Sequence, residues 1–97
     1  MPYSRSIRYI NKMKKVISAL ANDDFTLELT FDDCSVRRFD VKPYLEKGIF
    51  TELKDLDYYK DFRIVFDTVQ WRNGQDFAPE TLYFESVEIN MDALAEV

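Results

Sequence analysis

The sequence predicts an α+β fold, in which an antiparallel β-sheet built from hairpins carries two or three short helices. Three observations support this class. Residues 25–31 alternate apolar and polar side chains without a break, as in a strand with one buried face. Turn residues follow such segments at short intervals, and Asn73-Gly74 is the strongest hairpin signal. Pro43 and Pro79 stand where short helices are expected to begin.

The chain is long enough for one domain with one core. It has 97 residues, 46% of them hydrophobic, with eight Phe, six Tyr and one Trp. Because each buried ring removes a large area from water, a few of them fill a core of this size. We interpret the aromatic residues as core; stacking on bases or sugars is the alternative, and it requires rings on the surface.

The first half of the domain is predicted to form three strands. Residues 16–20 form a short strand, a turn at Asn22-Asp23-Asp24 leads into 25–31, and a turn over residues 32–35 leads into 36–41. The alternation is disturbed at Arg37-Arg38, since Val36 falls on the face opposite Phe39. This disturbance predicts a β-bulge at the two arginines.

Short helices are predicted between the two β units. The first spans residues 43–47, with Gly48 as its left-handed terminator and with Leu45 and Ile49 pointing inward. The second is capped by Asp55 or Asp57 and contains Tyr58 and Tyr59. Helices this short are marginal alone, so both are expected to pack on the sheet.

The second β unit begins with residues 62–66, a turn at Asp67-Thr68 and a strand over 69–71. Asn73-Gly74 predicts a type I′ turn, in which Gly74 takes the positive φ. Pro79 is expected to open a helix over 79–84. Val87, Ile89 and Met91 alternate as a last edge strand, followed by a short helix or a frayed end.

The charge distribution suggests three segments: residues 1–14, a domain over 15–91, and a tail over 92–97. The first fifteen residues contain five basic and no acidic side chains, whereas the rest has eight basic and eighteen acidic ones. Three interpretations of the basic segment stay open. It is an upstream extension that precedes a start at Met13, a tail that wraps the acidic body, or an arm that touches nucleic acid.

The acidic body predicts a basic protein partner and disfavours nucleic-acid binding by the body itself. A homo-oligomer formed through a sheet edge is a further interpretation. No apolar run is long enough to span a bilayer, and no signal-peptide pattern opens the chain. With a single cysteine, Cys34, the sequence predicts a cytoplasmic protein without membrane contact.

The residue types for common catalytic chemistry are scarce, and we predict a protein that is not an enzyme, with no cofactor and no metal. The chain has no His, which removes the commonest general base and metal ligand. The acidic neighbours of Cys34 argue against a reactive thiolate. Turn chemistry accounts for the pairs Asp23-Asp24 and Asp32-Asp33. Only two glycines occur in the chain, so it contains no glycine-rich phosphate loop.

Residues 69–83 form the densest group of informative side chains. One interpretation is structural, because a hairpin that leads into a proline-initiated helix accounts for each landmark. The functional interpretation is a protein-recognition patch near one end of the sheet, since Trp and Arg are typical anchors of interfaces. The patch comprises Trp71, Arg72, Asn73, Asp76 and Glu80.

The sequence resembles a bacterial family known as domain of unknown function 2442. The resemblance covers residues 15–86 and rests on three motifs, at residues 27–33, at 45–50 with 53–55, and at 71–83. Cys34 stands where family members usually have Gly, and Arg72 where many have Pro. The resemblance implies an α+β fold with small helices on an antiparallel sheet and no known activity. Some members carry an added helix-turn-helix, for which this chain ends too soon after Ser86.

Members of the family are suspected of being the antitoxin-like half of small two-gene modules. We therefore expect a non-enzymatic protein-interaction module, in its specific form an antitoxin-like subunit whose acidic surface masks a basic partner. The alternative is a nucleic-acid-associated regulator that uses the basic arm.

Overall fold

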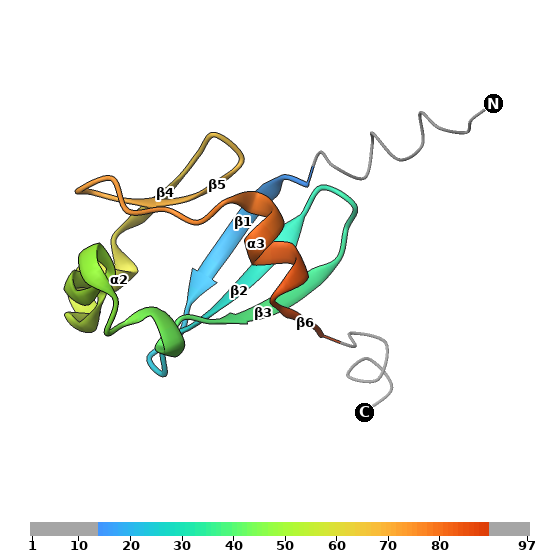
Figure 1. Cartoon of the computed structure of the whole chain (residues 1–97). Coiled ribbons are helices and arrows are strands. Elements are labelled where there is room, and N and C mark those ends of the chain that lie inside the picture. Colours follow the sequence, from blue (N-terminus) through green and yellow to red (C-terminus); the bar gives the residue numbers. More distant parts are fainter. Residues whose placement is uncertain (1–13, 90–97) are drawn as a thin grey trace.

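The computed structural model describes residues 14–89, which fold as a four-stranded antiparallel sheet, a separate hairpin and several short helical segments (Figure 1). The sheet has the order β1-β2-β3-β6 and the hairpin consists of β4 and β5. The α+β prediction is confirmed. In chain order, the elements are β1 Val16–Ala21, β2 Thr26–Phe31, β3 Val36–Asp40, the 3₁₀ segments η1 Lys42–Tyr44 and η2 Gly48–Lys54, α2 Leu56–Lys60, β4 Phe62–Val65, β5 Thr68–Trp71, α3 Pro79–Phe84 and β6 Val87–Glu88.

One face of the four-stranded sheet carries the core. Leu27, Leu29 and Phe31 alternate along β2 and are fully buried, as the apolar periodicity predicts. Phe39 on β3 lies opposite Leu27 and joins them. The core is completed by the hairpin, the helical segments and the loop before α3, through the buried residues Leu53, Tyr59, Val69, Trp71, Phe77 and Leu82.

The predicted bulge at Arg37-Arg38 is wrong. The register between β2 and β3 is regular through Leu29 opposite Arg37 and Glu28 opposite Arg38. Arg37 instead occupies a core-facing position between β2 and β6, where Nε donates to Ser86 Oγ at 2.7 Å and the guanidinium lies over the Tyr83 ring. The irregularity lies in β1, between Val16 and Ser18.

Three hairpin connections in the domain share one turn geometry. After β1, after β2 and after β5, the fourth residue of the turn donates its N–H to the carbonyl of the first. The first residue donates its own N–H to the carbonyl of the fifth. This is a type I turn followed by a residue in the left-handed region. The left-handed positions are Phe25 (φ 65°), Cys34 (φ 73°) and Gly74 (φ 92°).

The predicted type I′ turn at Asn73-Gly74 is therefore wrong, although Gly74 does have the positive φ. The two-residue turn with two positive φ values lies between β4 and β5, at Phe66 (54°) and Asp67 (69°). It was expected one residue later, because Phe66 continues the apolar alternation of β4. The Phe66 ring is 83% exposed.

The helical predictions are confirmed in part. Asp55 caps α2 by accepting from the N–H groups of Asp57 and Tyr58, and Pro79 occupies the first turn of α3. The helix expected over 43–47 is only the 3₁₀ segment Lys42–Tyr44, and Ile49 is 66% exposed rather than inward. Gly48 has the expected positive φ, at 48°. Met91 and the tail lie outside the described residues, as does most of the basic segment.

Candidate functional site

The region around the β5 turn brings together part of the predicted patch. Arg72 and Asn73 are exposed at the turn itself. Asp76 is exposed and faces Gln70 across an isolated antiparallel bridge, and Glu80 is exposed in the first turn of α3. Arg72 and Asn73 thus share one turn, and no side-chain hydrogen bond or ion pair within residues 14–89 joins them to Asp76 or Glu80.

Trp71 does not belong to the surface, which corrects its assignment as an exposed anchor. Only 2% of the residue is accessible, and the indole Nε1 donates to the Tyr59 carbonyl at 2.6 Å. The Tyr59 hydroxyl in turn donates to the Thr26 carbonyl at 2.8 Å. Burial raises the pKa of the Tyr59 hydroxyl well above its ordinary value. Trp71 and Tyr59 therefore tie the hairpin and α2 to β2.

A second buried polar residue, Gln75, organises the loop. The patch predicted from the sequence does not include it. Its amide donates to the Ile49 carbonyl at 3.0 Å and to Glu52, and its oxygen accepts from the Tyr58 hydroxyl at 2.6 Å. Gln75 is 2% exposed, so these hydrogen bonds satisfy the donor and acceptor of its side-chain amide, which water does not reach. Nothing in the residue type reveals this burial; it is visible only once η2, α2 and the turn are placed together.

Glu52 and Tyr58 extend this network to the surface. The Asn73 amide donates to both Glu52 carboxylate oxygens, at 3.0 and 2.8 Å, and the Asn73 backbone N–H donates to the Tyr58 hydroxyl at 2.9 Å. Arg72 forms an ion pair with Asp61 and lies over the Tyr58 ring. The motif around residues 71–75 thus fixes η2 and α2 against the end of the hairpin.

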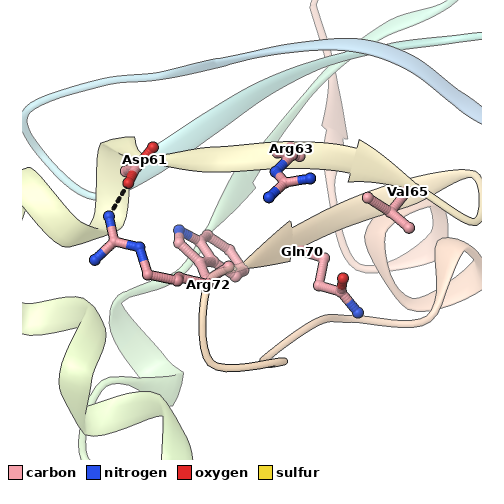
Figure 2. A pocket seen from close by; sticks show the side chains of 6 residues that line it. Asp61, Arg63, Val65, Gln70 and Arg72 are labelled. Atoms are coloured by element: carbon pink, nitrogen blue, oxygen red, sulfur yellow. Dashed lines mark hydrogen bonds and ion pairs between the residues drawn. The ribbon is translucent and has the colours of Figure 1, made fainter.

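A shallow cleft of about 160 Å³ lies on the polar face of the hairpin, lined by Asp61, Arg63, Val65, Gln70, Trp71 and Arg72. Figure 2 shows Arg63 and Gln70 extending from neighbouring strands and Arg72 directed toward Asp61. Arg63 takes part in no ion pair with residues 14–89. The cleft offers guanidinium and amide donors beside one carboxylate, a set suited to polar recognition.

Two acidic turns each contain a carboxylate that accepts hydrogen bonds from the residue two positions later. Asp24 accepts from the Thr26 hydroxyl at 2.6 Å and the Thr26 N–H at 3.2 Å. Asp33 accepts in the same way from Ser35, at 2.6 and 2.9 Å. These hydrogen bonds, with the side-chain ones largest, lower the pKa of both carboxyl groups.

Neither a cluster of metal ligands nor a membrane-spanning helix occurs in residues 14–89. Within residues 14–89, no three His, Cys, Asp or Glu side chains are grouped so that they could hold a metal ion. Over the same range, no helix has the length and apolar character needed to cross a membrane.

The fold and this site define a small α+β domain in which a polar network around residues 71–75 connects η2 and α2 to the hairpin. The chain belongs to the family described as "Protein of unknown function (DUF2442)", whose model matches residues 16–88. Comparison with curated proteins and with solved structures gave no match.

Proposed function

We propose that the protein is a non-enzymatic interaction module that binds a basic protein partner through its acidic surface. In its specific form, the protein is the antitoxin-like subunit of a two-gene module. The observation that carries the proposal is the charge of the folded part. Residues 14–89 contain sixteen acidic and ten basic side chains, and six of the sixteen carboxylates form ion pairs within this range.

Of the remaining ten carboxylates, five accept hydrogen bonds within this range and five do not. Asp57, Asp76 and Glu80 are exposed and use no side-chain hydrogen bond within the described residues. Charge of one sign on one protein accelerates association with the opposite sign on another, and salt weakens that effect. The absence of His from the sequence supports a role other than catalysis.

The test measures association of the full chain with the protein encoded beside it, or with the protein that co-purifies from the native host at low salt. The triple variant Asp57→Asn, Asp76→Asn and Glu80→Gln should lower the association rate and its salt dependence. The matched control is Asp57→Glu, Asp76→Glu and Glu80→Asp, which keeps every charge. Failure to recover a partner at low salt, or an association rate indifferent to salt, contradicts the proposal.

A second function, nucleic-acid regulation through the basic segment, is favoured by the five basic residues among the first fifteen. Of these, Lys14 and Lys15 lie within the described range, and the Lys14 ammonium lies 4.1 Å from the centroid of the Tyr83 ring. Deletion of residues 1–14 should abolish binding to DNA or RNA while leaving the fold intact. Binding that survives the deletion excludes the segment from that role.

A further inference from the structure

The polar cleft of the hairpin is lined by two side chains whose hydrogen-bonding groups are unused. Arg63 on β4 lies directly opposite Gln70 on β5, so both side chains extend from the same face of the hairpin. Within residues 14–89, neither side chain forms a hydrogen bond or an ion pair. Both residues line the cleft. Two neighbouring side chains with donors to offer therefore face one opening.

A second guanidinium borders the same cleft and is held in place. Arg72 forms an ion pair with Asp61, and its guanidinium carbon lies 5.6 Å from the centroid of the Tyr58 ring. Figure 2 shows Arg72 turned toward Asp61, while no interaction joins Arg63 to the other residues drawn. The lining thus has two guanidinium groups and one carboxylate, which gives it a net charge of +1.

The charge of the cleft is opposite in sign to that of the folded part as a whole. Residues 14–89 contain sixteen acidic and ten basic side chains. Among the arginines of this range, Arg63 is the one that forms no ion pair. Asp76 faces Gln70 from the other side of β5 but does not line the cleft. The cleft therefore presents donors and positive charge within an acidic surface, as a site for an anion does.

The donors and the charge favour a carboxylate over other anions. The two oxygens of a carboxylate match the paired N–H groups of a guanidinium, and their remaining lone pairs can accept from the Gln70 amide. Its single negative charge is balanced by the net charge of the lining. A phosphate group carries more than one negative charge and is repelled more strongly by Asp61. With a volume of about 160 Å³, the cleft suits a carboxylate on a short aliphatic stem, for which Val65 offers an apolar contact.

We propose that this cleft is a binding site for a carboxylate group, which accepts hydrogen bonds from the Arg63 guanidinium and the Gln70 amide, with Arg72 as a second cation beside it. The carboxylate belongs to a small organic acid or to an acidic side chain of a binding partner, and the same groups recognise both. The site does not use the acidic surface, so it is separate from the proposed function, and its first test needs no protein partner.

The first test is an NMR titration of the full chain with sodium acetate, in which sodium chloride keeps the ionic strength constant. The side-chain N–H signals of Arg63 and Gln70 should shift together and saturate, with a dissociation constant of about 1–20 mM for so small a ligand. Inorganic phosphate should bind several-fold more weakly. Shifts that stay linear up to about 100 mM acetate, or tighter binding of phosphate than of acetate, overturn the proposal.

Arg63→Gln should weaken acetate binding by about tenfold or more, because it removes the guanidinium. The matched control is Arg38→Gln, since Arg38 is also an exposed arginine on a strand but lies on β3 and pairs with Glu28. The control should keep the wild-type affinity, and thermal unfolding of both variants verifies that each is folded. Equal affinities of the two variants for acetate overturn the assignment to this cleft.

A variant that strengthens binding separates the site from a general loss of fold. Asp61→Asn removes the carboxylate that competes for Arg72, so the affinity for acetate should rise by about threefold or more. Asp57→Asn is the matched control, because Asp57 is exposed on α2 and does not line the cleft. An Asp61→Asn protein that binds acetate no more tightly than the Asp57→Asn protein overturns the proposal.

Glutamate blocked as its N-acetyl amide distinguishes the two sources of the carboxylate. Binding that is about tenfold tighter than that of acetate supports an acidic side chain of a partner, because the backbone groups add contacts. Equal binding of the two probes supports a small organic acid. In either case Arg63→Gln should weaken both probes alike, and binding of either probe that this substitution leaves unchanged overturns the site.

Discussion

Replacing Cys34 by glycine should stabilise the protein, although it removes a side chain. Cys34 occupies the left-handed position of the turn after β2, with φ 73°, and its side chain is exposed. A non-glycine residue in this region costs about 1–2 kcal/mol. The exposed thiol makes no hydrogen bond within residues 14–89 that would offset that cost.

The expected gain follows from two opposing terms. Relief of the backbone strain contributes about 1–2 kcal/mol, and the greater freedom of glycine in the unfolded chain takes back about 0.5–1 kcal/mol. We therefore expect Cys34→Gly to raise the free energy of unfolding by about 0.5–1 kcal/mol. For a domain of this size, that corresponds to a rise in Tm of about 2–8 °C.

Urea unfolding followed by tryptophan fluorescence measures this difference, because Trp71 is buried at the core. Cys34→Ala is the matched control: it removes the thiol but retains a Cβ, so the strain remains. Gly74→Ala supplies the converse, since Gly74 holds the same turn position with φ 92° and should lose about 1–2 kcal/mol. If Cys34→Gly is no more stable than Cys34→Ala, the backbone-strain argument is wrong.

Three further predictions concern the polar groups. Gln75→Leu should lower the unfolding free energy by about 2–3 kcal/mol in urea titrations, because it removes the three hydrogen bonds of a buried amide. Asn73→Ala, at the exposed side of the same network, should cost less than about 1 kcal/mol. Arg37→Met should lower Tm by about 4–8 °C, corresponding to about 1 kcal/mol, since it keeps the packing stem but removes the hydrogen bonds to Ser86. The pKa values of Asp24 and Asp33 lie below the ordinary 3.8 in the folded state. The stabilisation that these carboxylates contribute is therefore present above that pH and is lost as the pH falls through the lowered values. Asp33→Asn should flatten the acid limb of the stability–pH curve, and an unchanged limb would contradict this.

The sheet could be predicted because periodicity records burial directly. Residues 25–31 alternate, and the structure buries the apolar set of β2. The Arg37 error shows where that reasoning stops. A charged residue at an inward position resembles a register fault in the sequence. In the structure, Ser86 and the Tyr83 ring, both distant in sequence, provide partners for the guanidinium.

The candidate site was predictable in its location but not in its composition. The turn at residues 71–75 is dense in polar and aromatic side chains, and it does lie where η2, α2 and the hairpin meet. Whether Trp71 or Gln75 faces solvent depends on those neighbours, which no local pattern specifies. Both are buried at 2% exposure, so Trp71, which the sequence indicated as an anchor, is part of the core instead.

The residues with positive φ separate into those that the fold of one chain compensates and those that it does not. Phe25 is strained in the same way as Cys34, but its ring packs 5.0 Å from that of Tyr59, so burial offsets the backbone cost. Cys34 has no such compensation, and glycine should improve it. Phe66 has none either, and it combines the strain with a side chain that is mostly exposed. Strain without local compensation should be relieved by substitution, so Phe66→Asn, which suits this two-residue turn, should be at least as stable as the wild type.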